Sequence, residues 1–228
     1  MTANVEELVV GILGGTGDQG RGLANRFARA GHRVIIGSRS EERARDAAGE
    51  LAGTLPGGSN QTGTLHGMTN AGTSREADVI IAAVPWEGHA ALLTSLAAEL
   101  AGKIVIDCVN PLGFDAKGAY ALPVAEGSAA QQAASVLPDS TVVAAFHHVS
   151  AKLLLDAEVK TVELDVLVLG DDREATDLVQ ALAARIPGMR GVYAGRLRNA
   201  GQVEALTANL VAVNRRYKAH AGLRITDI

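Results

Sequence analysis

Three glycines near the start of the chain are spaced in a way that could hold a phosphate. The segment 14–20 reads GGTGDQG, so Gly15, Gly17 and Gly20 satisfy the spacing G-x-G-x-x-G. In such a turn the first glycine permits the tight bend, the second lets the backbone approach a pyrophosphate, and the third lets the following helix pack closely. Glycine-rich turns are common, so the interpretation depends on context. Here the turn lies between an apolar run and an amphipathic segment, which favours a dinucleotide site at a helix N-terminus.

The next informative residues come at the expected end of the second strand, about 20 residues after the turn. NAD-binding domains commonly carry an Asp or Glu there, but this chain has Ser38 and Arg39, with Arg43 one helical turn later. A hydroxyl and two guanidinium groups suit the 2′-phosphate of NADP, because arginine offers planar, charge-assisted donors to phosphate oxygens. The alternative is that both arginines are solvated charges beside Glu41 and Glu42 at a helix start. The missing acid favours NADP, because a carboxylate would repel that phosphate.

The periodicity of the apolar residues supplies the elements that would position these groups. Apolar runs bounded by glycines alternate with helical patterns, which predicts an α/β fold with a Rossmann-type, doubly wound parallel sheet. The expected strands are 8–13, 34–36, 64–66, 79–84, 104–106 and 141–145. The expected helices are 20–30, 41–51, 74–78, 87–100 and 128–136, with loops at 53–63 and 110–127.

Residues 149–228 are expected to form a small C-terminal α+β domain beside a nucleotide-binding domain of residues 1–148. The predicted elements are a strand at 165–169, a helix capped by Asp172, and a long helix at 200–218. The long helix carries an apolar stripe made of Val203, Leu206, Leu210, Val213 and Tyr217. Such a stripe is typical of a core or dimer face, and we expect a homodimer through this helix.

Composition excludes several classes of function. The chain has 228 residues, a formal net charge of −4 and 3% aromatic residues, which provides neither a basic surface nor stacking platforms for nucleic acid. Its apolar runs are shorter than the roughly 18 residues of a membrane span, and its N-terminus lacks a signal-peptide pattern. Cys108 is the single cysteine, so neither a disulfide nor a cysteine-based zinc site is expected. A reducing, cytoplasmic location follows.

Five longer segments are more specific than the glycines alone. They read LGGTG at 13–17, GSR at 37–39, VPWE at 84–87, IDCVNP at 106–111 and VEALT at 203–207. With these segments the chain resembles, nearly end to end, the NADPH-dependent reductases of the deazaflavin coenzyme F420. The resemblance implies that NADP lies across the glycine turn and that the deazaflavin packs against its nicotinamide, in a cleft between the two domains.

The same resemblance implies which residues contact each coenzyme. The NADP contacts would be Thr16, Gly17, Asp18 and Gln19 at the pyrophosphate, Ser38, Arg39 and Arg43 at the 2′-phosphate, and Val84 and Ala151 at the nicotinamide. The deazaflavin contacts would be Trp86 and the strand-end residues His147, His148 and Val149. The chain departs from the family pattern at Arg198, Ala200, His148 and Ser150, where the family has small hydroxyl residues and a proline. Arg198 would suit the coenzyme's phosphate or polyglutamate tail.

The implied reaction is direct hydride transfer, which needs two carbons stacked in near-attack geometry but neither a nucleophile nor a metal. The sequence contains no H-E-x-x-H, G-x-S-x-G or P-loop lysine pattern. His147 is the one side chain that we expect to orient the coenzyme or steady charge on its reduced ring. A packed or solvated histidine is the alternative.

Two alternative functions stay open. One is an NADPH-dependent reductase of a flavin or ferric acceptor. The other is a non-enzymatic NADP-sensing module whose C-terminal helix signals to a partner. Turnover with different acceptors would separate these possibilities.

Overall fold

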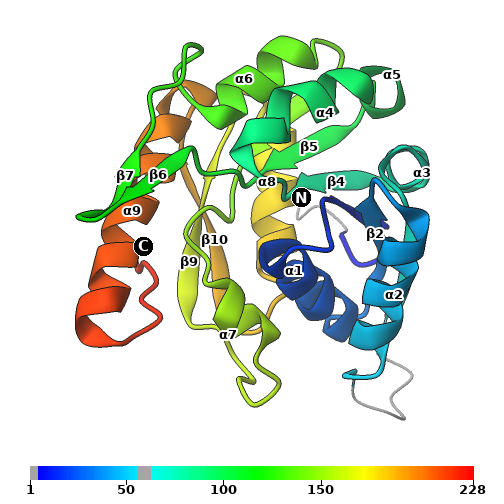
Figure 1. The fold of residues 1–228 in the computed structure, drawn as a ribbon, viewed down its shortest axis with the longest axis horizontal. Helices are drawn as coiled ribbons and strands as arrows, with labels where there is room; N and C mark the ends of the chain where they lie inside the picture. Colours follow the sequence, from blue (N-terminus) through cyan, green and yellow to red (C-terminus); the bar gives the residue numbers. More distant parts are fainter. Residues whose placement is uncertain (1–4, 56–62) are drawn as a thin grey trace.

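The computed structural model describes residues 5–55 and 63–228, and their strands form one eight-stranded sheet and a separate hairpin (Figure 1). The first six strands of the sheet are β1 (Val10–Leu13), β2 (Arg33–Ser38), β3 (Thr64–Thr69), β4 (Val79–Ala82), β5 (Ile104–Asp107) and β8 (Thr141–Ala144). They lie in the order β3-β2-β1-β4-β5-β8, and every neighbouring pair among them is parallel. This order confirms the predicted doubly wound, Rossmann-type sheet.

Helices cover both faces of the sheet because successive residues of a buried strand point to opposite sides. Val79 and Ile81 of β4 belong to a core shared with helices on one face, which are α1 (Asp18–Arg29), α2 (Glu41–Ala52) and α8 (Arg173–Ala183). Ile80 and Ala82 of the same strand belong to a second core on the other face. The helices of that face are α3 (Asn70–Glu76), α4 (His89–Ser95), α5 (Ala97–Leu100) and α6 (Ala129–Val136).

Residues after 148 extend the same sheet. After α7 (Ala151–Leu155), β9 (Leu164–Leu169) pairs antiparallel with β8 through Ala144 and Leu169, and β10 (Met189–Gly195) pairs parallel with β9. The short turn η2 (Leu197–Asn199) leads into α9 (Ala200–Tyr217). This helix lies beside the hairpin of β6 (Leu112–Asp115) and β7 (Gly118–Ala121) at one edge of the molecule (Figure 1). The domain division at residue 148 stays a prediction.

The predicted loop 110–127 contains the β6–β7 hairpin, which the sequence analysis missed. Its turn is closed by the Asp115 carboxylate, which accepts hydrogen bonds from the backbone N–H groups of Lys117 and Gly118. Gly118 has a φ of 127°, a conformation that favours glycine. Strand β10 and helix α7 were missed as well, and residues 56–62 of the predicted loop 53–63 lie outside the described residues.

The expected single helix 87–100 is divided into three pieces. They are the 3₁₀ turn η1 (Trp86–Gly88), α4 and α5. Leu96 leaves the helical conformation with φ −112° and ψ 7°, and its N–H bonds to Leu93 three residues earlier. The helical pattern in the sequence is therefore real but is interrupted at Gly88 and at Leu96. No helix in the described part of the chain is long and apolar enough to cross a bilayer.

Candidate active site

The glycine turn joins β1 to α1, as the sequence predicts. Gly14 has a φ of 67°, and its carbonyl accepts a hydrogen bond from Gly17 N–H at 3.2 Å. A Cβ added at Gly20 would lie 2.6 Å from the Cα of Gly15, so the start of the helix packs directly on the turn. A Cβ added at Gly17 would instead meet only the Gly14 carbonyl, at 3.7 Å. The turn therefore leaves an open, exposed backbone surface at the N-terminus of α1, where a pyrophosphate would fit.

Asn70 supports this turn from below and was missed by the sequence analysis. Its side-chain oxygen accepts a hydrogen bond from Gly14 N–H at 3.5 Å. The same oxygen would lie 2.8 Å from a Cβ added at Gly37, so a side chain at this position of β2 would clash with Asn70. The spacing of Asn70 from the turn, 56 residues along the chain, leaves no local signal in the sequence.

The predicted 2′-phosphate residues lie at the end of β2. Ser38 is buried, and its hydroxyl accepts a hydrogen bond from Ser40 N–H at 3.3 Å. Arg39 and Arg43 are exposed, and among residues 5–55 and 63–228 neither forms an ion pair or side-chain hydrogen bond. Glu41 pairs with Arg45 instead. Two guanidinium groups next to the glycine turn are therefore available to an anionic ligand.

Val84 and Ala151, predicted at the nicotinamide, both lie close to the turn. Val84 follows β4, and its Cγ1 would be 2.6 Å from a Cβ at Gly14. Ala151 begins α7, and its carbonyl would be 3.5 Å from a Cβ at Gly22. Helix α7 is held there by buried Arg26, whose guanidinium donates hydrogen bonds to four backbone carbonyls at the end of α7 and in the loop after it.

The strand-end turn 146–149 connects the glycine turn to the other predicted coenzyme residues. Phe146 has a φ of 64°, which is strained for a bulky residue and needs support from its surroundings. Gln19 donates a hydrogen bond to the Phe146 carbonyl at 3.4 Å. The His147 carbonyl accepts hydrogen bonds from Asn110 Nδ2 at 2.8 Å and from Thr207 Oγ1 at 3.2 Å. Segments after β5, after β8 and on α9 therefore meet at one point.

The two histidines of this turn are buried and favour the neutral form. Burial lowers the pKa of His147, and the nearby Asp107 carboxylate and the backbone of Cys108 and Val109 oppose this only in part. Neither ring nitrogen of His147 has a partner with hydrogen-bond geometry in the described part of the chain. Burial lowers the pKa of His148 to about 4, and its Nε2 accepts a hydrogen bond from Leu167 N–H at 3.3 Å. His147 is thus a buried polar group that a ligand could satisfy.

Trp86 and Val149 complete the predicted coenzyme contacts. Trp86 is half-buried in η1, just after the end of β4, and Val149 is buried beside the two histidines. Arg198 is exposed in η2. The structure therefore brings the predicted contacts of both coenzymes to the carboxyl edge of the sheet, where ligands bind in open α/β folds.

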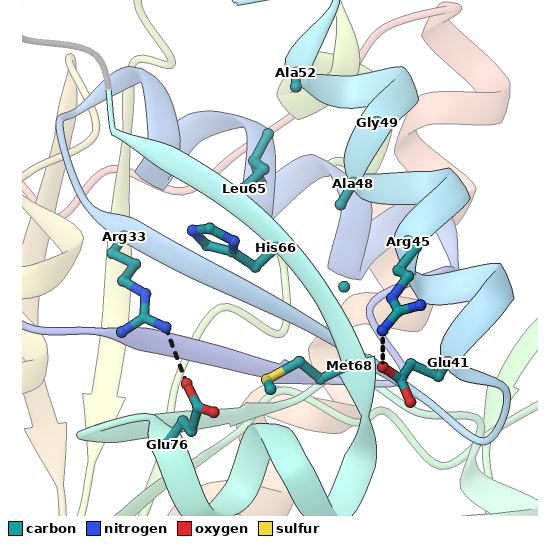
Figure 2. Close-up of a pocket in the computed structure, with 11 residues that line it drawn as sticks. Arg33, Glu41, Arg45, Ala48, Gly49, Ala52, Leu65, His66, Met68 and Glu76 are labelled. Atoms are coloured by element: carbon teal, nitrogen blue, oxygen red, sulfur yellow. Dashed lines mark hydrogen bonds and ion pairs between the residues drawn. The ribbon is translucent and has the colours of Figure 1, made fainter.

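A separate groove of about 510 Å³ runs between α2 and the outer strand β3. Figure 2 shows Leu65, His66 and Met68 of β3 on one side of it, with ion pairs Arg33–Glu76 and Arg45–Glu41 at its ends. None of the predicted coenzyme contacts lines this groove. The candidate active site is consequently the edge of the sheet and not this groove.

The relation to known proteins agrees with this geometry. Residues 9–111 match the profile of a family described as NADP oxidoreductase, coenzyme F420-dependent. Over 224 residues the chain is 39% identical to the F420-dependent NADP reductase of Methanothermobacter marburgensis, which covers 96% of this chain and 98% of the relative. The chain belongs to the family of F420-dependent NADP reductases.

Two further relatives show how far the family relation extends. A solved structure of a proposed F420-dependent NADP reductase from Arthrobacter sp. FB24 has a TM-score of 0.79 and 26% identity, covering 96% of this chain and 100% of that one. The metalloreductase STEAP3 of Rattus norvegicus is 34% identical over 202 residues, which span 89% of this chain but 37% of that protein. The architecture of the F420-dependent NADP reductases therefore extends over the whole chain, whereas the metalloreductase contains much additional sequence.

Proposed function

We propose that this chain catalyses reversible hydride transfer between NADP(H) and coenzyme F420. The observation that carries the proposal is the meeting of two surfaces at one sheet edge, linked by the hydrogen bond from Gln19 to the Phe146 carbonyl. One surface is the open glycine turn, and the other is the strand-end turn with its buried His147. When both coenzymes are bound, the nicotinamide supplies a hydride to a ring carbon of the deazaflavin, which also takes up one proton.

The residues of this chain contribute binding and orientation. Backbone N–H groups at Asp18 and Gln19 would hold the pyrophosphate above the open backbone of Gly17, with the positive end of the α1 dipole behind them. Ser38, Arg39 and Arg43 would hold the 2′-phosphate, as set out above. Val84 and Ala151 would then present an apolar wall to the nicotinamide, which excludes water from the transferring hydride.

The deazaflavin side is proposed to consist of Trp86 and the turn His147, His148 and Val149. A neutral His147 ring has one donor and one acceptor nitrogen, and burial keeps it in that form. It can therefore orient the coenzyme through hydrogen bonds without supplying a proton. Residues 149–228 would close the cleft, and exposed Arg198 would meet the anionic tail of the coenzyme.

The test is a spectral assay with purified protein. Mixing NADPH with oxidised F420 should bleach the deazaflavin absorbance, whereas NADH should give much slower bleaching. Free flavin and a ferric chelate are the acceptor controls, because the metalloreductase relative keeps the ferric alternative relevant. Bleaching of F420 by neither nucleotide, with tight NADPH binding, would contradict the proposal and favour a sensing module.

We also propose that the chain forms a homodimer and works in the cytoplasm. The apolar stripe of α9 becomes exposed toward its end, where Val213 is 37% and Tyr217 73% accessible. Phe114 and Tyr120 of the neighbouring hairpin are exposed too, and exposed apolar side chains of this size favour a protein interface. Light scattering should give a dimer mass for the parent chain and a monomer mass for Val213→Glu, and a monomeric parent would refute the dimer. The buried, unpaired Cys108 fits a reducing compartment.

A further inference from the structure

A buried ion pair lies behind the proposed deazaflavin side and has no part in the proposed chemistry. His89 begins α4 and Asp107 ends β5, and both side chains are fully buried. The Nε2 atom of His89 is 2.6 Å from Oδ2 of Asp107. The other carboxylate oxygen of Asp107 accepts a hydrogen bond from Val109 N–H at 3.0 Å. The pair therefore ties the start of α4 to the segment after β5.

The partners of His89 define its charge. Gln132 Nε2 donates to the Glu126 carboxylate at 3.3 Å, so its amide oxygen is the atom that faces His89 Nδ1, at 3.0 Å. Both ring nitrogens of His89 thus face acceptors, an arrangement that only the doubly protonated imidazolium satisfies.

The ionisable groups around His89 favour the same form. They are Asp107 on β5, Glu204 on α9 and, behind Gln132 of α6, Glu126. Burial opposes the charged form of His89, but Asp107, the Gln132 hydrogen bond and Glu204 together hold its pKa above the usual range.

Trp86 is the third member of this cluster. Its ring centroid lies 5.7 Å from that of His89, with 31° between the ring planes. At this distance an imidazolium is attracted to the negative face of the indole. Trp86 is itself half-buried in a three-residue turn that contains no buried side chain.

We propose that His89, held by Asp107 and Gln132, is a positioning residue that fixes the Trp86 indole at the mouth of the deazaflavin cleft. The role in coenzyme binding rests on the proposed function, but the positioning of Trp86 does not. The His89–Asp107 pair connects the segment after β5 to Trp86 in η1. Because His89 is fully buried, it would contact neither coenzyme. Its removal should therefore alter Trp86 first and coenzyme binding only through Trp86.

The fluorescence of the protein reports this directly, because Trp86 is the single tryptophan of the chain. A protonated imidazole in contact with an indole quenches its emission. The variant His89→Gln should therefore emit more strongly at pH 7, and acrylamide should quench its emission more efficiently because the indole is freed. His66→Gln is the matched control, since His66 is exposed on β3 and, within residues 5–55 and 63–228, its ring forms a hydrogen bond to Thr64 alone. This control should keep the parent's emission and acrylamide accessibility.

A second variant keeps the test informative if His89→Gln does not fold. Asp107→Asn retains the oxygen that Val109 N–H needs but removes the charge. The parent's emission should rise as the pH passes upward through the His89 pKa, above 6.5, and this transition should move to lower pH in Asp107→Asn. Emission and accessibility that equal those of the parent in both His89→Gln and Asp107→Asn would overturn the proposal.

The coenzyme arm uses a double-mutant cycle on F420 binding. His89→Gln should weaken F420 binding about tenfold and leave NADP binding unchanged. In a Trp86→Phe background the same substitution should cost much less, because the group that it positions is already altered. Equal losses in both backgrounds would overturn the positioning role. If the parent itself binds no F420, the proposed function fails, while the fluorescence result still decides the role of His89.

Discussion

The two sides of the proposed cleft are built in opposite ways. The NADP side consists of missing side chains and free charges, with an open backbone at Gly17 and an unpaired guanidinium at Arg39. The deazaflavin side consists of buried polar groups whose partners come from distant segments, such as Asn110 and Thr207 on the His147 carbonyl. The exposed residues of the first side come from local sequence, whereas the second side is assembled by tertiary contacts. Mutations of the exposed Gly17 and Arg39 should therefore act on binding alone, whereas mutations on the second side should act on stability and binding together.

The largest effect that separates the two sides is expected at Gly17. Gly17→Val should lower NADP affinity about a thousandfold, because the side chain would occupy the space of the pyrophosphate. Gly17 has an ordinary φ of −81°, and an added Cβ meets nothing closer than 3.7 Å, so the free energy of unfolding should stay within about 0.5 kcal/mol. Calorimetric titration with NADP and denaturant unfolding measure the two quantities.

Two other glycines serve as controls for this prediction. Gly20→Val should lower stability as well as affinity, because its Cβ would meet the Cα of Gly15 at 2.6 Å. Gly49→Ala on α2 should leave NADP affinity unchanged and raise stability by about 0.5–1 kcal/mol, since its added Cβ has nothing within 4 Å and alanine favours a helix. If Gly17→Val were to retain NADP affinity, the pyrophosphate could not lie on this turn.

The next largest effect is the acid sensitivity of the deazaflavin side. The pKa of His148 is lowered to about 4 in the folded chain, whereas the unfolded chain has the usual value of about 6.5. Above about pH 6.5 His148 therefore adds no pH dependence to the free energy of unfolding. Between these two values the unfolded chain binds a proton that the folded chain does not. The free energy of unfolding should therefore fall by up to about 3 kcal/mol as the pH drops from 6.5 to 4.

The variant His148→Gln isolates this contribution. Its amide can still accept the hydrogen bond from Leu167 N–H, but it does not titrate. The stability of the parent relative to the variant should therefore decrease from pH 7.5 to pH 4.5, as measured by urea unfolding. The comparison with the variant is needed because another group titrates in the same range. Burial raises the pKa of Glu204 to about 7, so protonation of Glu204 stabilises the folded chain relative to the unfolded chain as the pH falls below 7. A parent–variant difference that is constant with pH would contradict the neutral His148.

The sequence signals of the predicted NADP side are short-range. The glycine turn, Ser38 and the absence of an acid lie within one βαβ unit, and the strand order follows from the alternation of apolar runs and helical patterns. Ser128 and Asp172 are the N-caps of α6 and α8, and the helix near 128–136 and the Asp172 cap were both predicted. Local chemistry fixes these features, so a local pattern reveals them.

The deazaflavin side was predicted only in outline, because its geometry depends on distant partners. Asn110 and Thr207 reach the His147 carbonyl across 37 and 60 residues of chain, and no spacing indicates that they meet. The His89–Asp107 pair was missed for the same reason. Strand β10 was missed because this edge strand is largely half-buried and has no clear alternation of buried and exposed residues. Such features can be identified only once the fold is known.

A smaller effect should sharpen the nucleotide preference of the NADP side. Arg39→Ala should weaken NADPH binding about tenfold to hundredfold, the range expected for a lost charge-assisted hydrogen bond. NADH lacks the 2′-phosphate, so its affinity should not change. Arg45→Ala on α2 is the control, because Arg45 already pairs with Glu41. An equal loss of NADH and NADPH affinity would mean that Arg39 acts on structure and not on the phosphate.

The smallest expected effect tests whether stability and binding change together on the deazaflavin side. Asn110→Ala removes the shorter of the two hydrogen bonds to the His147 carbonyl and leaves that of Thr207, so it should lower the free energy of unfolding by about 1 kcal/mol. Because the strained Phe146 lies next to this carbonyl, the turn should shift and the KM for F420 should rise while NADP affinity stays the same. Asn110→Asp is the matched variant, since a carboxylate cannot donate to the carbonyl. The contrast between the two sides would break if Asn110→Ala lowered NADP affinity as much as it raised the KM for F420.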